Sequence, residues 1–317
     1  MRKVTLLYNP LSGQRREERL ADMRAVVAVL REAGLHVTAA PTQAAADASE
    51  QARHAVAGGS DTVFACGGDG TVHDVIQGLV GTEAALGIIP MGTANALAHD
   101  LGLPLSPVAA ARAALTAQPR RIAVGKITFQ DFQDGQASRY FGVTAGVGVD
   151  AYLFHELDSA AKLRLGIMAY YLHAAWLWLT HRMRRFTVQF QGERGEVCCM
   201  QVTELLAVRI RNFGGVLRVL APGASLDRPD LRLVLFRTRS RFRYLLYVLR
   251  GLLGLPWRTG GVKLAYSRGA ECRVLAPRPG KRAVPIYVEA DGEFLGKLPA
   301  EISVVPDALT ILSPSQR

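Results

Sequence analysis

The run Gly67-Gly68-Asp69-Gly70-Thr71 follows a short apolar segment, Thr62 to Ala65, and precedes a segment with helical spacing, Val72 to Val80. A short apolar run bounded by glycine is typical of a buried strand. Glycine lets the backbone approach a ligand closely, and N–H groups at the start of the next helix can donate to an anion. We therefore expect a strand, an anion-binding turn and a helix at this place.

Two further loops have the same setting and hold small or polar residues. Asn9-Pro10-Leu11-Ser12-Gly13 follows the apolar run Val4 to Tyr8, and Gly92-Thr93-Ala94-Asn95 follows Leu86 to Ile89. A single glycine loop after a strand is as often only a tight turn. None of the three loops matches G-x-x-x-x-G-K-[ST] or G-x-G-x-x-G, which excludes these two nucleotide-binding fingerprints. Together the three loops predict a polyphosphate site of another type.

The first 121 residues alternate between strand-like and helix-like segments. The helix-like segments include Glu17 to Ala33 and Ala44 to Ala57, and another is expected after Asn95. Such alternation predicts an open α/β sheet whose loops gather at the carboxyl ends of the strands. After Arg121 the pattern changes to mainly antiparallel β segments, interrupted by an aromatic helical segment from Ser159 to Arg184.

Length and composition limit the class of protein. With 317 residues, 49% hydrophobic and 21% charged, the chain is long enough for two globular domains and too apolar for disorder. The formal net charge of +11 indicates attraction to an anionic partner without selecting one. The four cysteines show neither C-x-x-C spacing nor nearby histidine pairs, so no zinc site or redox pair is expected.

In their order and spacing, the three loops resemble the diacylglycerol kinase catalytic-domain family, which includes bacterial lipid kinases and sphingosine kinases. The resemblance continues nearly to the end of the chain. Its further matching segments are Gly146-x-Gly148-x-Asp150-Ala151, Gly214-Gly215, Ala221-Pro222-Gly223-Ala224, and Asp291-Gly292-Glu293 followed by Pro299.

The resemblance implies an NAD kinase/diacylglycerol kinase-like α/β nucleotide-binding domain and a mainly antiparallel β-sandwich domain, with ATP in the cleft between them. The implied boundaries are 1–121 for the ATP-binding domain, 122–305 for the lipid-substrate domain and 306–317 for a C-terminal segment returning to the first domain. The implied nucleotide-binding residues are Asn9, Ser12, Gly13, Thr42, Gly67, Gly68, Asp69, Gly70, Thr71, Gly92, Thr93 and Asn95.

The implied activity is transfer of the γ-phosphoryl group of ATP to a hydroxyl of a lipid such as diacylglycerol or a sphingoid base. Mg²⁺ would neutralise charge on the phosphates, and a carboxylate near the hydroxyl would take its proton. For this base we favour Glu293, followed by Asp291, with Asp69 as the other acidic candidate. The structural alternative is an Asp-Gly turn with a solvated glutamate. Glu289 is expected to be an ordinary surface charge.

One segment departs from the family pattern, which usually has an acidic pair and a glycine after the Ala-Pro-x-Ala motif. The chain here has Leu226-Asp227-Arg228-Pro229-Asp230, with Arg228 and Pro229 where the second acid and the glycine are expected. This change removes one of the usual metal ligands and suggests that the cation of this segment is replaced. Asp227 and Asp230 remain the candidate metal ligands.

Two segments combine apolar and basic residues in a way that suits an anionic membrane surface. The first runs from Leu163 to Phe186 and the second from Arg237 to Arg250. Each cation near such a surface adds about 1 kcal/mol of binding. The longest apolar stretch, Leu165 to Thr180, contains His173 and is shorter than the roughly 20 residues of a membrane-spanning helix.

We therefore expect a cytoplasmic protein, without a signal peptide, that docks peripherally on the inner face of the membrane to reach a lipid substrate. The alternative is that both apolar faces pack inside the protein. The sequence predicts no particular oligomeric state.

Three other interpretations remain open. A catalytically impaired lipid- or nucleotide-binding protein is suggested by Arg228-Pro229, while the retained Asp291-Gly292-Glu293 weighs against it. An NAD kinase also has a Gly-Gly-Asp-Gly-Thr run, but the Asn9-Pro10-x-Ser12-Gly13 loop and the apolar C-terminal half argue against this activity. Nucleic-acid binding rests on charge alone, without a recognisable binding module, so no nucleic-acid partner is expected.

Overall fold

The computed structural model of the chain divides into two compact units. Unit 1 comprises Met1–Val124, Asn212–Val216 and Val305–Arg317, and unit 2 comprises Gly125–Arg211 and Leu217–Val304. The chain therefore returns to unit 1 twice. The structure describes residues 1–10, 16–42, 47–149, 151–152, 176, 179–180, 182–214, 220–255, 259–276 and 284–314.

Unit 1 is built on a parallel sheet. Its strands are, in spatial order, β4 (Ala85–Pro90), β3 (Thr62–Gly67), β1 (Lys3–Tyr8) and β2 (His36–Pro41). The last part of β15 (Glu293–Ser313) pairs in parallel with β4, with Thr310 opposite Ala85. Every residue of β3 and β4 is buried, as expected for parallel strands that are covered on both faces.

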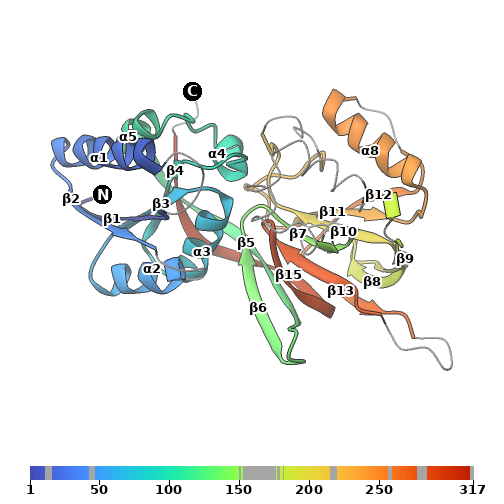
Figure 1. The fold of residues 1–317 in the computed structure, drawn as a ribbon. Helices are drawn as coiled ribbons and strands as arrows, with labels where there is room; N and C mark the ends of the chain where they lie inside the picture. The colour runs from blue at the N-terminus through green and yellow to red at the C-terminus, as the bar shows by residue number, and fades with distance from the viewer. Residues whose placement is uncertain are drawn as a thin grey trace. The chain divides into compact units, whose positions relative to one another are not determined.

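Helices cover both faces of this sheet (Figure 1). They are α1 (Arg16–Glu32), α2 (Asp47–Ala57), α3 (Asp69–Leu79), α4 (Ala96–Asp100) and α5 (Pro107–Thr116). Helix α1 packs against α5 on one face, and α2 packs against α3 on the other. The alternation of strands and helices expected from the sequence is confirmed. The periodicity does not predict α5, because its buried face consists of alanines, Ala110, Ala111 and Ala114.

Unit 2 is mainly antiparallel. Its strands, of which β5 begins in unit 1 and β15 ends there, are β5 (Gln118–Gln130), β6 (Gln136–Phe141), β7 (Thr144–Gly148), β8 (Phe186–Gln191), β9 (Val197–Val202), β10 (Glu204–Val208), β11 (Leu231–Phe236), β12 (Val262–Ser267), β13 (Gly269–Val274), β14 (Tyr287–Ala290) and β15. Paired strands follow the order β12-β11-β10-β7-β14-β15, and β13, β8 and β9 continue from β15. Their buried side chains form one core that includes Phe141, Phe186 and Leu205. The expected fold class is confirmed.

Helix α8 (Arg241–Leu253) lies beside β11 and β12 on unit 2 (Figure 1). Its Tyr244 and Tyr247 pack on the ring of Phe236, with ring centroids 4.2 and 5.1 Å away. Gly254, in the left-handed conformation with φ 64°, ends the helix.

Most of the helical segment expected from residue 159 to 184 lies outside the described residues, as do Ser12, Gly13, Asp150 and Gly215. Among the helices that are described, none is both long and apolar enough to cross a membrane.

Candidate active site

The three loops of unit 1 leave the sheet at one edge. Strand β3 pairs with both β1 and β4, and all three run in the same direction. The register places Gly67, the last residue of β3, opposite Pro90, the last residue of β4. The loops that follow these strands therefore begin side by side (Figure 1).

Asp69 joins the second loop to the third. Its carboxylate accepts hydrogen bonds from the backbone N–H groups of Asn95 (3.0 Å) and Ala96 (2.7 Å), at the start of α4. Ionised acceptors make stronger hydrogen bonds than neutral ones. Asp69 therefore fixes the position of the third loop, and both of its oxygens are engaged in doing so.

Asn95 closes the third loop on itself. The backbone N–H of Gly92 donates to the side-chain oxygen of Asn95 at 2.9 Å, and the Asn95 side-chain nitrogen donates to the Gly92 carbonyl at 3.0 Å. Asn95 itself has φ 49°, a conformation that asparagine tolerates better than most residues. The asparagine of this loop thus shapes the backbone between residues 92 and 95.

Glycine is required where the two loops meet. A Cβ atom on Gly92 would lie 2.4 Å from the Cα atom of Gly68, and a Cβ atom on Gly67 would lie 2.4 Å from the Thr71 hydroxyl oxygen. Distances this short are not found for real Cβ atoms, so a larger residue at Gly92 would move the third loop away from the second, and one at Gly67 would disturb the second loop itself. The glycines therefore bring two backbone segments into direct contact.

Helix α3 begins at this contact. Gly68 is its N-cap residue and makes no side-chain cap hydrogen bond. The first N–H groups of a helix have no partner within the helix, and together with the helix dipole they favour an anion. The start of α3 is therefore suited to a phosphate group.

The other implied nucleotide residues are placed as follows. Asn9 directly follows β1, and the backbone N–H of Thr42 donates to the Tyr8 carbonyl at 2.8 Å. Thr42 is buried and holds the ends of β1 and β2 together, whereas Thr93 is exposed in the third loop. Ser12 and Gly13 lie outside the described residues.

A segment that the sequence analysis does not assign to unit 1 also reaches α4. The backbone N–H of Asn212 donates to the Asp100 carboxylate at 2.8 Å. Gly214 has φ 75° and approaches His99 so closely that a Cβ atom would lie 2.1 Å from the imidazole Cδ2. Gly214 belongs to one of the segments that resemble the family, but nothing in the sequence pattern indicates its contact with α4.

In unit 2, the Asp291-Gly292 turn connects β14 to β15. Both residues have positive φ, 51° and 86°. The Asp291 carboxylate accepts three hydrogen bonds, all 2.9 Å long, from the backbone N–H groups of Gly142, Val143 and Thr144. Asp291 therefore ties this turn to the connection between β6 and β7.

The two glutamates beside this turn differ in exposure. Glu289 is fully buried and accepts a hydrogen bond from the Gly292 N–H at 2.9 Å. The expectation that Glu289 is a surface charge is wrong, because its side chain is fully buried on β14, an inner strand that pairs with β7 and β15. Glu293 is exposed at the start of β15. Of the three acids at residues 289, 291 and 293, only Glu293 is an exposed residue.

Aromatic rings gather around Phe294, the residue that follows Glu293 in the chain. The ring of Phe294 stacks on Phe132 with centroids 5.0 Å apart and meets Tyr287 edge to face at 5.3 Å. Tyr287 in turn stacks on Tyr152 at 6.4 Å. Tyr152 and Tyr287 also line a cavity of about 290 Å³, together with Gly148, Ile286 and other residues of unit 2. Sequence reasoning does not find this cluster, since its members come from four separate segments.

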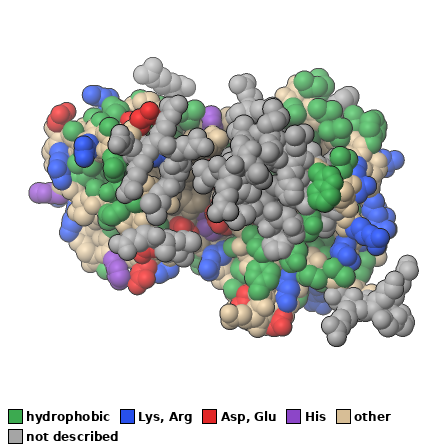
Figure 2. Space-filling view, viewed as in Figure 1, with side chains coloured by type: hydrophobic (Ala, Val, Ile, Leu, Met, Phe, Trp, Pro, Cys, Tyr) green, Lys and Arg blue, Asp and Glu red, His purple; other side chains and the backbone are tan. Residues whose placement is uncertain are grey.

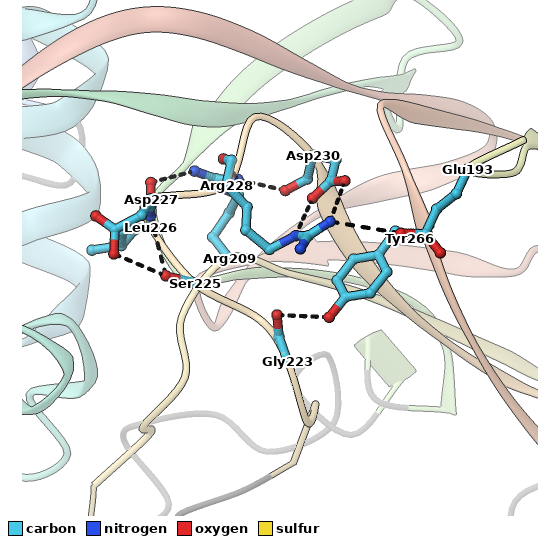
Figure 3. Close-up of polar contacts among 9 residues, drawn as sticks. All are labelled: Glu193, Arg209, Gly223, Ser225, Leu226, Asp227, Arg228, Asp230 and Tyr266. Carbon is cyan, nitrogen blue, oxygen red and sulfur yellow. Dashed lines mark hydrogen bonds and ion pairs between the residues drawn. The ribbon is translucent and has the colours of Figure 1, made fainter.

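The segment from Ser225 to Asp230 contains the candidate metal ligands, and arginines organise it (Figure 3). Both carboxylate oxygens of Asp230 accept from Arg228, at 2.7 and 2.8 Å, and an oxygen of Asp227 accepts from the Ser225 hydroxyl at 3.2 Å. The Arg228 guanidinium also lies 3.8 Å from the centre of the Tyr266 ring. Asp230 is thus engaged by a cationic side chain.

A second arginine, Arg209, which follows β10, contacts the same segment. Its guanidinium is fully buried and donates to the carbonyl oxygens of Leu226 (3.1 Å), Arg228 (2.9 Å) and Asp230 (2.6 Å) (Figure 3). Burial lowers the pKa of Arg209 to about 10, against the opposing effect of the nearby Asp230 and Asp227 charges, so the side chain stays charged at neutral pH.

These contacts do not fit a Mg²⁺ ion at this segment. Mg²⁺ requires a nearly octahedral set of oxygen ligands, and here guanidinium groups already occupy the Asp230 carboxylate and three carbonyl oxygens of the segment. Elsewhere in the described ranges, no group of three or more His, Cys, Asp and Glu side chains is placed to hold a metal ion.

Comparison with protein families gives two matches that together span most of the chain. Residues 3–127 match the diacylglycerol kinase catalytic domain. Residues 143–313 match the YegS C-terminal NAD kinase beta sandwich-like domain. The first match contains the three loops of unit 1, and the second contains the Asp291-Gly292-Glu293 turn.

Individual relatives agree with these matches. The chain is 33% identical to a diacylglycerol kinase of Mycobacterium tuberculosis, over 98% of this chain and 95% of the relative. It is 34% identical to a probable YegS-like lipid kinase of Chromohalobacter salexigens, over 79% and 76% of the two chains.

Solved structures show the same fold. A putative diacylglycerol kinase from Bacillus anthracis superimposes with a TM-score of 0.76 at 20% identity, covering 99% of this chain and 95% of that one. Yeast NADH kinase in complex with NADH gives a TM-score of 0.55 at 11% identity, covering 100% and 84%.

Proposed function

The chain belongs to the diacylglycerol kinase family, and we propose that it is an ATP-dependent lipid kinase. The proposed reaction transfers the γ-phosphoryl group of ATP to a hydroxyl of a lipid such as diacylglycerol or a sphingoid base. The observation that carries this proposal is the contact between the two glycine loops, which Asp69 and Asn95 hold together at the start of α3.

The loops of unit 1 fit the phosphates of a nucleotide. The backbone at Gly68 and Gly92 carries no side chain that would keep a phosphate away, and α3 offers N–H donors beside it. Phosphoryl transfer depends mainly on such positioning and on neutralisation of charge. The proposed nucleotide-binding residues are Asn9, Ser12, Gly13, Thr42, Gly67, Gly68, Asp69, Gly70, Thr71, Gly92, Thr93 and Asn95.

Mg²⁺ bound to the ATP phosphates would supply the remaining neutralisation of negative charge. Because the segment from Ser225 to Asp230 does not fit the ion, we propose that Arg209 and Arg228 hold this segment in place of a structural metal. The metal requirement of the enzyme would then belong to the nucleotide alone.

Glu293 is the proposed general base. It would accept the proton of the lipid hydroxyl while the hydroxyl oxygen bonds to the γ-phosphorus and the bond from this phosphorus to the β-phosphate oxygen breaks, releasing ADP. Asp69 and Asp291 are less suited to this role, because each already accepts two or three backbone hydrogen bonds. We therefore assign them to positioning the two turns.

The aromatic cluster of Phe132, Tyr152, Tyr287 and Phe294 is the proposed contact surface for the apolar part of the lipid. It begins at Phe294, the residue that follows Glu293, and extends to the cavity lined by Tyr152 and Tyr287. Aromatic rings supply large apolar contact areas, which suits the hydrocarbon next to a reacting hydroxyl.

The proposal is tested with purified protein, labelled ATP, Mg²⁺ and a panel of acceptors. The panel contains diacylglycerol, sphingosine, ceramide and phosphatidylglycerol in detergent micelles, with NAD as a non-lipid acceptor. We expect label in one lipid. Label in NAD alone contradicts the proposal, and ATP binding without transfer to any acceptor identifies a catalytically impaired binding protein.

The nucleotide site has its own test. Asp69→Ala removes the acceptor of two backbone hydrogen bonds, so the third loop loses its fixed position. We expect the Kd for ATP, measured by calorimetry, to rise about tenfold or more. An unchanged Kd would show that these loops do not bind the nucleotide.

A further inference from the structure

Helix α8 has an apolar face on each side. One face is buried and includes Tyr244, Tyr247 and Gly251. The other is exposed and consists of large apolar side chains in one stripe at helical spacing: Phe242 (67% exposed), Leu245 (45%), Leu249 (38%) and Leu253 (66%), continued by Leu255 (40%). These are five of the twelve large hydrophobic residues that are exposed in the described part of the chain. Scattered exposed leucines are ordinary, but a continuous stripe indicates a binding surface.

Contacts of the buried face fix the orientation of α8. The exposure of the stripe therefore does not result from loose packing of the helix on unit 2. The Tyr244 hydroxyl lies 2.7 Å from the Thr203 hydroxyl, and the Tyr247 hydroxyl donates to the Leu220 carbonyl at 2.6 Å. Both rings pack on Phe236. The orientation of α8 is thus determined by residues other than the stripe.

The sequence around α8 carries only positive charge. The sequence from Leu231 to Ala270 contains nine arginine and lysine residues and no aspartate or glutamate. Arg237, Arg239 and Arg243 are exposed at the start of the helix. Figure 2 shows hydrophobic side chains gathered over α8, with arginine and lysine side chains nearby and no acidic ones among them.

The positions of these arginines are unfavourable within the protein itself. The first turn of a helix favours negative charge, yet α8 has Arg241 and Arg243 in its first turn and no acid there. An external anion would remove this conflict. A surface that combines such cations with an apolar stripe is complementary to a partner that has an anionic surface layer above an apolar interior.

We propose that α8 is an interfacial helix that docks unit 2 on an anionic phospholipid bilayer. The side chains from Phe242 to Leu253 enter the boundary of the hydrocarbon, and Arg237, Arg239 and Arg243 contact the headgroups. The inference rests on the proposed function in one respect, which is that a lipid substrate lies in a bilayer. Binding of the protein to the bilayer requires neither ATP nor catalysis.

Vesicle sedimentation of the full chain without nucleotide tests the proposal. We expect binding to vesicles of equal parts phosphatidylcholine and phosphatidylglycerol, and weak binding to phosphatidylcholine alone. Phe242→Ser with Leu253→Ser should lower the affinity for the mixed vesicles at least about tenfold. Arg239→Glu with Arg243→Glu should lower it further, since each cation contributes about fivefold before its charge is reversed.

Matched controls use residues away from α8. The control variants are Leu105→Ser, at a residue of unit 1 that is 49% exposed, and Arg139→Glu, at an exposed residue of β6. Both variants should bind the vesicles like the unchanged protein. Circular dichroism and kinase activity on lipid in detergent micelles should stay the same in the α8 variants. If the unchanged protein showed no kinase activity in micelles, this result would contradict the proposed function but would leave the docking proposal standing.

Three results would overturn the docking proposal. The first is equal binding of the unchanged protein to both vesicle types. The second is equal binding of the α8 variants and the unchanged protein to the mixed vesicles. The third is a dimer in light scattering that Phe242→Ser with Leu253→Ser converts to a monomer, because the stripe would then be covered by a second copy of the chain.

Discussion

The glycine loops of unit 1 and the Asp291-Gly292-Glu293 turn of unit 2 share one structural feature and differ in another. In each, an aspartate side chain accepts backbone N–H groups of a neighbouring loop, two for Asp69 and three for Asp291. The turn of unit 2 has in addition an exposed carboxylate, Glu293. This difference shows that an acid within a family motif is not necessarily a reacting group, since Asp69 and Asp291 accept backbone N–H groups and thereby position loops.

The largest effect should come from Glu293→Gln. Glutamine keeps the size of the side chain but cannot take a proton at neutral pH, so kcat should fall by about 10²- to 10⁴-fold. Binding of ATP and the free energy of unfolding should not change, because Glu293 is exposed. Single-turnover transfer from labelled ATP measures the effect.

The matched control is Glu301→Gln, which changes an exposed glutamate on the same strand. It should leave kcat unaltered. Full activity of Glu293→Gln would contradict the assignment of Glu293 as the general base and of Asp69 and Asp291 as positioning residues.

Asp291→Ala should instead act mainly on stability. It leaves three backbone N–H groups of the connection between β6 and β7 without their acceptor, and uncompensated buried donors cost about 1 to 3 kcal/mol each. We expect urea unfolding to show a loss of at least about 3 kcal/mol, the lower limit for three such donors. A stable Asp291→Ala protein with greatly reduced kcat would instead make Asp291 a reacting group.

Gly92→Ala tests the contact between the loops of unit 1. The added methyl group would meet Gly68, so the third loop should shift and the Kd for ATP should rise about tenfold, as measured by calorimetry. Gly260→Ala is the control, because a Cβ atom there meets no other atom within 4 Å. Equal ATP affinities of the two variants would contradict the assignment of this loop.

The smallest effects are expected at the arginine-held segment of residues 225–230. Arg228→Gln removes a partly exposed ion pair with Asp230 and should lower the free energy of unfolding by about 1 kcal/mol or less. Chelation of divalent metal should leave the thermal unfolding temperature unchanged. A clear drop on chelation would show that a metal ion, and not Arg209 and Arg228, holds this segment.

Part of the fold follows from local patterns. The apolar runs that became β1, β3 and β4 are long enough, and bounded clearly enough by glycine and proline, to predict buried parallel strands. Helix α5 has no comparable signal, because alanine contributes little to hydrophobic periodicity although Ala110 and Ala111 are fully buried. The return of residues 212–216 to unit 1 has no local signal at all.

The candidate site shows the same division. Residue types at the loops predict phosphate binding, since glycine and helix starts have this property wherever they occur. The burial of Glu289, in contrast, accompanies the pairing of β14 with β7, a strand from a distant part of the chain, as well as with the adjacent β15. Sequence reasoning therefore misplaced this residue.

By itself, the amino-acid sequence determined the kinds of element, their order and the loops that could receive a phosphate, because these depend on neighbours within a few residues. Only the tertiary structure decided which acids are engaged by backbone, which arginines hold residues 225–230, and that α8 leaves an apolar stripe exposed. Each of these depends on which distant segments pack together. A side chain acquires its role from those partners, and local spacing does not specify them.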